Sequence, residues 1–286
     1  MAPAAAMSLG RRQVAEILAL HGLAPSRALG QNFLVDANVA RRIARLSGVG
    51  AGDAVVEIGA GLGALTLALA ATGASVTALE IDRHLIPLLR ESVGGTEVRV
   101  VQGDALRLDW DALLKGASSW VVVANLPYNV ATPLLLLLLE GAPRVRRLVV
   151  MVQTEVAQRL VAAPGGRAYG AVSVRVAYWA QAAVLARVGP AVFLPRPKVG
   201  STLVELRRLD SPALGPEVDY GELVRLVRAG FGQRRKMLRR SLEGTVEAGD
   251  LRAVGIRPEA RAEELDLEAW GRLVAWRSRG TPPRPS

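Results

Sequence analysis

Cysteine is absent from the 286-residue chain. The chain therefore has no disulfide framework, no thiolate metal site and no cysteine nucleophile, and we expect no metal centre. Long apolar segments are also missing: the longest, residues 130–139, contains Thr132 and Pro133 and falls short of the roughly 20 apolar residues that span a bilayer. Residues 1–10 have neither a basic start nor a long apolar stretch. We therefore expect no secretory signal and no membrane attachment, and a cytoplasmic protein is the simplest interpretation.

Composition and charge indicate a folded, basic protein. Hydrophobic residues make up 50% of the chain and charged residues 22%, which is typical of globular rather than disordered proteins. A chain of 286 residues has room for one large domain and a smaller second one. Lys and Arg outnumber Asp and Glu by 36 to 26, which gives a net charge of +10. Such a surface favours nucleic acid, although a high arginine content can also reflect codon bias.

A glycine-rich turn followed by an acidic strand end predicts a nucleotide cofactor. The apolar strand expected at 54–58 runs into Gly59 and Gly61. Such glycines let the backbone approach a ligand closely, although they also occur in ordinary tight turns. The next strand, 75–79, ends at Glu80, about 20 residues further on, where a carboxylate can accept both hydroxyls of a ribose. Together the two features favour an adenosine-containing cofactor.

Two further strand ends carry polar groups that suit a nitrogen base. Asp104 follows the strand expected at 97–101 and can either accept a hydrogen bond from an adenine amine or cap the next helix. Residues 125–128, Asn-Leu-Pro-Tyr, follow the apolar run 120–123. The amide can accept from an amine, the proline stiffens the turn and the ring can stack on a planar base. Because the carboxyl ends of parallel strands form the ligand crevice of an open α/β sheet, these groups predict one shared site.

Periodicity and turn residues give the remaining elements. We expect the first two helices at 11–20 and 37–47, the second with Asp36 as its N-cap. A Rossmann-like, seven-stranded sheet with antiparallel final strands is expected, and the proline-rich segment 190–197 is expected to be a fixed loop. The other expected strands are 147–152, 172–178, 182–188 and 202–206, and the other expected helices are 64–71, 133–140, 155–162, 220–231, 234–242, 248–254 and 266–277.

The motifs in this order resemble a known group of enzymes. The segments at 57–63, 80–82, 103–105 and 125–128 are similar to the motifs of S-adenosylmethionine-dependent methyltransferases that act on the exocyclic amine of adenine. More narrowly, the segments at 30–34, 153–160, 193–199 and 231–236 resemble the ribosomal RNA adenine dimethyltransferases, over about residues 27–270. Within that family the motifs are most similar to the small-subunit (16S rRNA) branch, the kasugamycin-resistance methyltransferases. Two departures are Ala60, where proline is common, and Gly200, where aspartate is usual.

The resemblance implies a role for each matching residue. The implied reaction transfers methyl groups from S-adenosylmethionine, twice per base, to give N6,N6-dimethyladenosine. The implied cofactor-binding residues are Asn32, Leu34, Gly59, Gly61, Glu80, Asp104 and Asn125. The residues implied to hold the target base are Asn125, Leu126, Pro127, Tyr128 and Phe193, with Tyr128 and Phe193 stacking on its two faces. The plainer alternatives are that Tyr128 plugs a strand end and that Phe193 belongs to the core.

A basic segment in a helical C-terminal domain is expected to hold the RNA. We expect four parts: an N-terminal extension and helix (1–26), a methyltransferase domain (27–210), a helical RNA-contacting domain (211–279) and a disordered tail (280–286). The expected phosphate contacts are Arg228, Arg234, Arg235, Lys236, Arg239 and Arg240. The expected partner is 16S rRNA in the small subunit or its precursor, and the chain is expected to act as a monomer.

Two rival functions are also compatible with these motifs. A 23S rRNA dimethyltransferase of the macrolide-resistance type shares most of the cofactor motifs. A non-catalytic RNA-binding or ribosome assembly factor could retain the same fold.

Overall fold

The computed structural model describes residues 10–278, which form two compact units. Unit 1 comprises the chain up to Ala157 together with Ala183–Arg208, and unit 2 comprises Gln158–Ala182 together with the chain from Leu209 onward. The sequence assigned residues 158–182 to the first domain, whereas in the structure they pack with the C-terminal helices. The tail expected to be disordered lies outside the described residues.

Unit 1 is built on a seven-stranded sheet, as the sequence predicted. Its strands are β2 (Ala54–Ile58), β3 (Ser75–Glu80), β4 (Arg99–Gln102), β5 (Trp120–Asn125), β6 (Val145–Gln153), β7 (Ala180–Val188) and β9 (Ser201–Arg208). They lie in the order β4-β3-β2-β5-β6-β9-β7. Strand β2 is parallel to β3 and β5, while β9 runs antiparallel to β6. The strand order therefore reverses at β2, and such a switch point is where open α/β sheets bind ligands.

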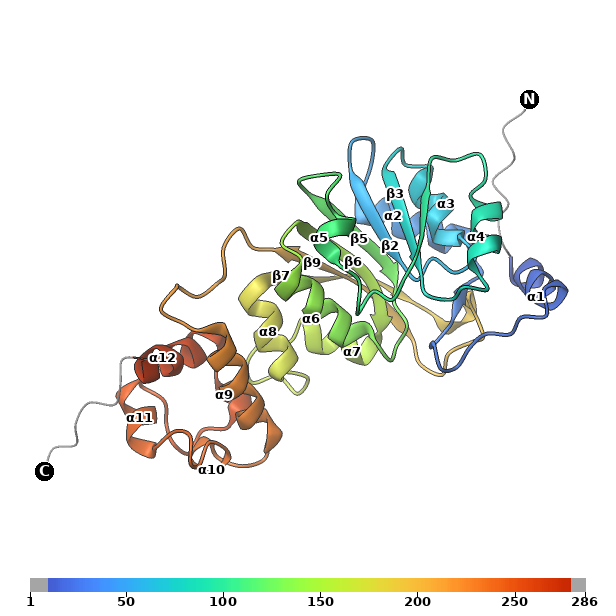
Figure 1. The fold of residues 1–286 in the computed structure, drawn as a ribbon. Helices are drawn as coiled ribbons and strands as arrows, with labels where there is room; N and C mark the ends of the chain where they lie inside the picture. Colours follow the sequence, from blue (N-terminus) through green and yellow to red (C-terminus); the bar gives the residue numbers. More distant parts are fainter. Residues whose placement is uncertain (1–9, 279–286) are drawn as a thin grey trace, which may run out of the picture. The chain divides into compact units, whose positions relative to one another are not determined.

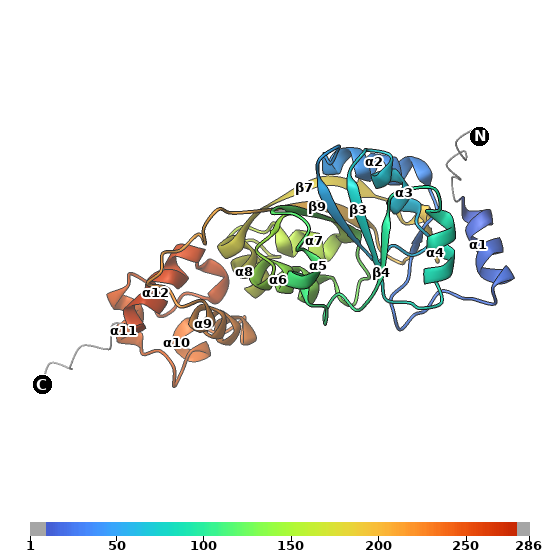
Figure 2. The same ribbon diagram turned by 45° about the horizontal axis from the view of Figure 1, so that its top comes forward.

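Helices cover both faces of this sheet, because its central strands are apolar on both sides. Val56 in β2 and Val122 in β5 have no exposed surface. The helices that begin in unit 1 are α1 (Arg11–Leu20), α2 (Ala37–Ser47), α3 (Ala64–Ala70), α4 (Ile86–Ser92), α5 (Trp110–Leu113), α6 (Ala131–Gly141) and α7 (Thr154–Leu160). Helices α2 and α3 lie on one face and α5 and α6 on the other (Figure 1 and Figure 2). Asp36 caps α2 as expected, since its carboxylate accepts from the backbone N–H of Asn38 at 2.8 Å.

A second, two-stranded sheet lies next to the loops that follow the main strands. Its strands are β1 (Phe33–Leu34) and β8 (Phe193–Leu194), which pair antiparallel. A short 3-10 turn, Pro190–Val192, precedes β8. The proline-rich segment is thus a loop as expected, except that two of its residues pair with a segment 160 positions earlier in the chain.

Arg208 links the end of α6 to the sheet through hydrogen bonds. Its side chain is 9% exposed and donates to the backbone carbonyls of Leu138 and Leu139 at 2.8 Å, and of Ala142 at 3.2 Å. It also donates to the carbonyl of Val145 at 2.8 Å. The last carbonyls of a helix have few partners within the helix, so the guanidinium adds donors there, beside the backbone N–H groups that already donate to Leu138 and Ala142.

Unit 2 is a helical bundle with a core of its own. Its helices are α8 (Ala171–Trp179), α9 (Tyr220–Gly232), α10 (Leu238–Ser241), α11 (Ala248–Ala253) and α12 (Leu267–Ser278). Trp270 of α12 is fully buried and packs among apolar side chains of the other helices. A Cβ atom on Gly230 would lie 2.7 Å from its ring. The glycine at 230 is therefore explained by close helix packing.

The strand that we expected at 172–178 is wrong, because these residues belong to helix α8. Valines at alternate positions suggested a strand, because β-branched residues favour sheets. In the structure Val174 and Tyr178, one helical turn apart, are buried in the core of unit 2. The hydroxyl of Ser173 also accepts from the backbone N–H of Gly170 at 3.1 Å, at the start of the helix. Burial of one helical face here outweighs the intrinsic strand preference of valine.

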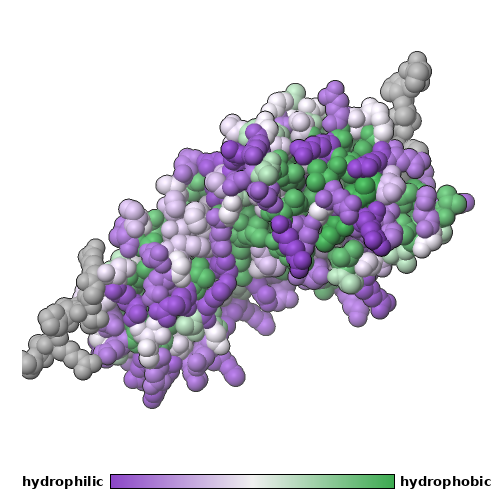
Figure 3. Space-filling view, in the orientation of Figure 1, coloured by the Kyte–Doolittle hydropathy of each residue, from purple (hydrophilic) through white to green (hydrophobic). Residues whose placement is uncertain are grey.

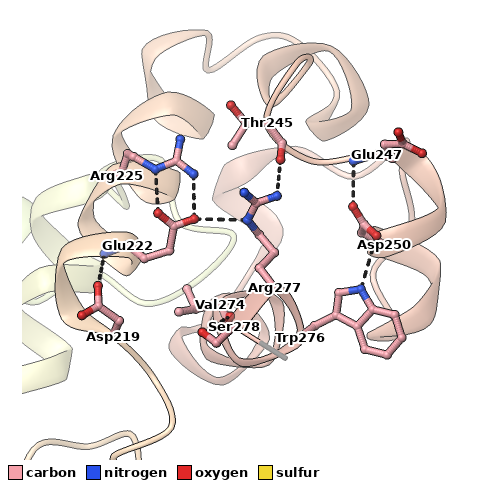
Figure 4. A network of polar contacts seen from close by, with 10 residues as sticks. All are labelled: Asp219, Glu222, Arg225, Thr245, Glu247, Asp250, Val274, Trp276, Arg277 and Ser278. Atoms are coloured by element: carbon pink, nitrogen blue, oxygen red, sulfur yellow. Dashed lines mark hydrogen bonds and ion pairs between the residues drawn. The ribbon is translucent and has the colours of Figure 1, made fainter. Parts of the chain in front are cut away.

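A polar network ties the helices of unit 2 together (Figure 4). Glu222 of α9 accepts two hydrogen bonds of 2.6 Å from Arg225 and one of 3.1 Å from Arg277 of α12. Arg277 also donates to the backbone carbonyl of Thr245. Hydrogen bonds from Arg225, followed by those from Arg277, hold the pKa of Glu222 below its ordinary value. The network links α9, α12 and the loop before α11.

Candidate active site

A cavity opens at the carboxyl ends of β2, β3 and β5. Gly59, Gly61 and Glu80 line it. Asn125 and Tyr128 line the side formed by the end of β5. The loop before β1 and the residues of β1 complete it, including Asn32 and Leu34. The structure thus brings together most of the residues that the sequence selected from separate strand ends.

The glycine turn and Glu80 form one hydrogen-bonded unit. Gly59 and Gly61 have positive φ values of 76° and 57°, which L side chains rarely adopt. The Gly61 N–H donates to Oε2 of Glu80 at 2.7 Å, and the Asp82 N–H donates to Oε1 at 2.9 Å. A Cβ atom on Gly61 would also lie 3.2 Å from the ring of Phe33. The turn therefore needs glycine, and it fixes the Glu80 carboxylate at the cavity wall.

Two buried carboxyl groups line the cavity. Glu80 is 5% exposed, and burial raises its pKa, while backbone N–H donors, with Asp82 first, partly offset that rise. Glu57, at 1% exposure, also lines the cavity, and its Oε2 atom has no hydrogen-bond partner. Burial raises the pKa of Glu57 to about 8, partly offset by the nearby Thr66 hydroxyl and reinforced by Glu80. Sequence reasoning did not assign Glu57 a role; an acid inside an otherwise apolar strand was the available signal.

The Asn125 motif is held from both sides. The side-chain N–H of Asn125 donates to the backbone carbonyl of Asn32 at 3.0 Å, and the Leu126 N–H donates to the carbonyl of Met151 at 3.1 Å. The first bond turns the amide so that its oxygen remains as the acceptor for another partner. Pro127 also lines the cavity, and the ring atom Cδ is 3.8 Å from a Cβ built on Gly59.

Tyr128 and Phe193 lie in different surroundings. Tyr128 is partly buried, lines the cavity and places its hydroxyl 2.9 Å from that of Ser201. Phe193 is fully buried among core side chains and does not line the cavity. In this structure its ring therefore presents no accessible face to a base, which agrees with the plainer alternative for this residue.

Asp104 caps a turn and does not line the cavity. Its carboxylate accepts from the Leu106 N–H at 2.9 Å and lies 3.6 Å from the guanidinium of Arg107. The next helix, α5, is capped by Asp109 instead, so the helix-capping role that the sequence left open for Asp104 is wrong, and contact with an adenine amine stays a prediction. The departure at Gly200 leaves its turn well held, because the Gly200 carbonyl accepts from both the N–H and the hydroxyl of Thr154, at 3.1 and 3.0 Å.

A hydrogen bond that sequence reasoning missed joins the loop before β1 to the end of β3. The Gln31 side chain donates to the carboxylate of Asp82 at 2.8 Å. Gln31 lines the cavity, while Asp82 follows Glu80 at the end of β3. Both residues stand in motifs that the sequence singled out, yet their pairing across 51 residues had no local signal.

The basic segment of unit 2 divides into free and paired cations. Within residues 10–278, Arg228, Arg235 and Lys236 are exposed and form no ion pair. Arg234 instead pairs with Glu263 at 2.7 Å and donates to the carbonyl of Arg167 at 2.7 Å. Arg239 and Arg240 face the exposed carboxylates of Glu259 and Glu243 at 4.0 and 3.3 Å. Such exposed ion pairs contribute little to stability, so a phosphate can easily replace the carboxylate. Hydrophilic side chains cover much of the visible face of this unit, at lower left in Figure 3.

The contacts of Arg234 also fix the position of Arg167, a cation that sequence reasoning did not select. Arg167 is exposed, and the bond to its carbonyl holds its loop beside residues 234–236. The Gly165 N–H, in the same loop, donates to the carbonyl of Glu263 at 2.7 Å. Arg234 therefore organises the basic surface of unit 2, and Arg167 extends it.

Comparison with known proteins identifies the family. The pattern of the family described as ribosomal RNA adenine dimethylase matches residues 25–278. The chain belongs to the ribosomal RNA adenine dimethylase family. It is 45% identical over 266 residues to the ribosomal RNA small subunit methyltransferase A of Moorella thermoacetica, covering 88% of this chain and 92% of that protein. It is 46% identical over 268 residues to the protein of the same name from Cutibacterium acnes, covering 88% and 89%.

Solved structures agree with membership of the dimethylase family. A dimethyladenosine transferase from Plasmodium falciparum superposes with a TM-score of 0.71 at 24% identity, covering 82% of this chain and 94% of that one, which shows a shared fold. The 23S rRNA methyltransferase ErmE superposes with a TM-score of 0.66 at 26% identity, covering 86% and 99%. The chain is thus a methyltransferase, and the methyl donor of its family is S-adenosylmethionine.

The cavity of this dimethylase fits that donor. S-adenosylmethionine carries a ribose, a cationic sulfonium and an ammonium group. Glu80 offers carboxylate oxygens at the strand end where a ribose is bound in related sheets, and Oε2 of Glu57, which has no hydrogen-bond partner within the protein, is available to a polar group of the donor. Among residues 10–278 there is no cluster of three His, Cys, Asp or Glu side chains that could hold a metal ion. No helix in that range is long and apolar enough to cross a membrane.

Proposed function

We propose that this protein dimethylates the exocyclic amine of adenines in 16S rRNA of the small ribosomal subunit. One observation carries the proposal: the amide of Asn125 and the ring of Tyr128 line the same cavity as the glycine turn and Glu80. An acceptor for a base amine thus adjoins a site for the methyl donor. The small-subunit enzymes named above are 45–46% identical to this chain, against 26% for ErmE, which favours the small-subunit substrate.

The reaction depends mainly on aligning the adenine amine with the methyl group of the donor. S-adenosylmethionine supplies a methyl group on a sulfonium centre, which is an electrophile. The lone pair of the adenine amine is delocalised into the ring, so Asn125 Oδ1 and the backbone carbonyl of Leu126 accept the two amine hydrogens and favour a more tetrahedral nitrogen. Tyr128 stacks on the base. No strong base is needed, because the methylated amine loses its proton readily.

The target adenine has to leave its stack, or be single-stranded, to enter the cavity. We assign RNA binding to unit 2, where Arg228, Arg235 and Lys236 are free to neutralise phosphates, with Arg239 and Arg240 as further contacts. Arg234 contributes by holding this surface in place. We place the enzyme in the cytoplasm, acting as a monomer on the small subunit or its precursor.

A labelled-donor assay on purified ribosomal subunits tests the substrate. We expect label in 16S rRNA of the small subunit, at bases that become dimethyladenosine. The second candidate, a 23S rRNA dimethyltransferase, is favoured by the similarity to ErmE and predicts label in the large subunit instead.

Substitutions test the residues. Asn125→Ala and Tyr128→Ala should each lower the methylation rate by at least tenfold, because each removes a contact to the reacting base. Either variant acting at the parental rate would remove that residue from the proposed mechanism. Complete absence of methylation by the parent on either subunit would favour the third candidate, a binding factor without catalysis.

A further inference from the structure

Ser201 lies beside the Asn125 motif, at the start of β9. Its hydroxyl oxygen is 2.9 Å from the phenol oxygen of Tyr128. Ser201 is 1% exposed and begins β9, where its backbone lies opposite Gln153 of β6. The contact joins the end of β5 to the start of β9 across 73 residues of sequence. A rigid sheet residue thus holds the far end of a side chain that lines the cavity.

The proposed reaction requires a defined orientation of the Tyr128 ring. Its face has to be parallel to the target base, and a tyrosine that rotated freely would lose conformational entropy when the base arrived. A hydrogen bond at the phenol oxygen fixes the ring at its outer end, while the backbone fixes it at the inner end. The orientation is then set before the RNA binds, so less of the binding energy goes into ordering the ring.

We infer that Ser201 is a positioning residue for methyl transfer, which holds the Tyr128 ring in the orientation that stacks on the target adenine. This inference rests on the proposed function of the Asn125–Tyr128 edge. Ser201 acts through Tyr128 and does not line the cavity itself. The serine therefore matters for the RNA substrate and not for the methyl donor.

A neighbouring hydroxyl provides a matched control. Thr202 follows Ser201 in β9 and is 2% exposed, and its side chain points to the opposite face because successive side chains alternate along a strand. Its hydroxyl lies 3.1 Å from that of Thr154 and does not contact Tyr128. Thr202→Val keeps the size of the side chain and removes a buried hydroxyl one position away. It therefore measures how much activity is lost when any buried hydroxyl is removed from this strand.

The test is a double-mutant cycle on methylation of small subunits. Ser201→Ala and Tyr128→Phe should each lower kcat/KM for RNA by about five- to tenfold, the equivalent of one lost hydrogen bond. The double variant should be no worse than either single variant, because both remove the same contact. The dissociation constant of S-adenosylmethionine, measured by calorimetry without RNA, should stay at the parental value in all three variants.

Several outcomes would overturn the inference. Additive losses in the double variant would show that the two hydroxyls act separately. Parental kcat/KM in Ser201→Ala, or an equal loss in Thr202→Val, would reduce Ser201 to an ordinary buried residue. Weaker donor binding in Ser201→Ala would point to general disturbance of the cavity. A parent protein that methylates neither subunit would instead remove the proposed function, and this inference with it.

Discussion

The buried Glu57 predicts an unusual dependence of stability on pH. An ordinary glutamate has a pKa of 4.5, and burial raises that of Glu57 to about 8. Between these values the folded protein holds a proton that the unfolded chain has released, so the free energy of unfolding falls as pH rises. At 1.36 kcal/mol per pKa unit the accumulated loss by pH 8 is about 5 kcal/mol. Above about pH 8 the loss is complete and this contribution becomes flat.

Glu57→Gln isolates this contribution, because glutamine has the shape of the protonated acid and does not titrate. Near pH 4.5 the variant should match the parent, and by about pH 8 it should be more stable by about 5 kcal/mol. Urea unfolding followed by circular dichroism at pH 5, 6, 7, 8 and 9 measures the difference. Glu97→Gln, a change at an exposed carboxyl, is the matched control. A gap between Glu57→Gln and parent that stays constant with pH would refute the reasoning.

Three further changes probe the glycine turn, the sheet and the proposed RNA-binding surface. Gly61→Ala has to adopt a positive φ of 57° with its Cβ 3.2 Å from the ring of Phe33, so we expect a loss of roughly 2 kcal/mol in unfolding experiments and weaker donor binding in calorimetry. Arg208→Ala removes four hydrogen bonds to backbone carbonyls, although those of Leu138 and Ala142 keep a backbone donor, and should cost about 3 kcal/mol or more of unfolding free energy, measured with urea. The double change Arg235→Ala and Lys236→Ala should weaken RNA binding and lower the slope of log affinity against log salt by roughly 1.5, with donor affinity unchanged; an unaltered slope would exclude these residues as phosphate contacts.

Sequence reasoning succeeded where the signal was local. The strands of unit 1 are short apolar runs that end at a polar residue, and both features are visible within about ten residues. Their order along the chain, with glycines after the first and an acid after the second, was sufficient to predict the sheet and the place of the cavity. Asn125 and Glu80 line that cavity because parallel strands bring their carboxyl ends to one edge.

It failed where the decisive contact was distant. Residues 172–178 carry a strand-like alternation of valines, and only the core of unit 2, built largely after residue 209, turns them into a helix. Asp104 was expected to meet an adenine amine or to cap the next helix, whereas Asp109 caps that helix and Asp104 holds a turn. Arg234 counted as a free cation in the sequence, whereas Glu263, 29 residues later, engages it. Such pairings carry no periodic signal.

Unit 2 is made from two stretches of chain that are separated by the last strands of unit 1. Its core needs Val174 and Tyr178 of α8 as well as the helices beyond residue 209. A fragment that begins at residue 211 would therefore leave an apolar hollow where α8 packs, and should aggregate or remain partly folded. During synthesis, α8 leaves the ribosome long before the helices that bury it. Completion of this small bundle is thereby delayed until nearly the whole chain has been made.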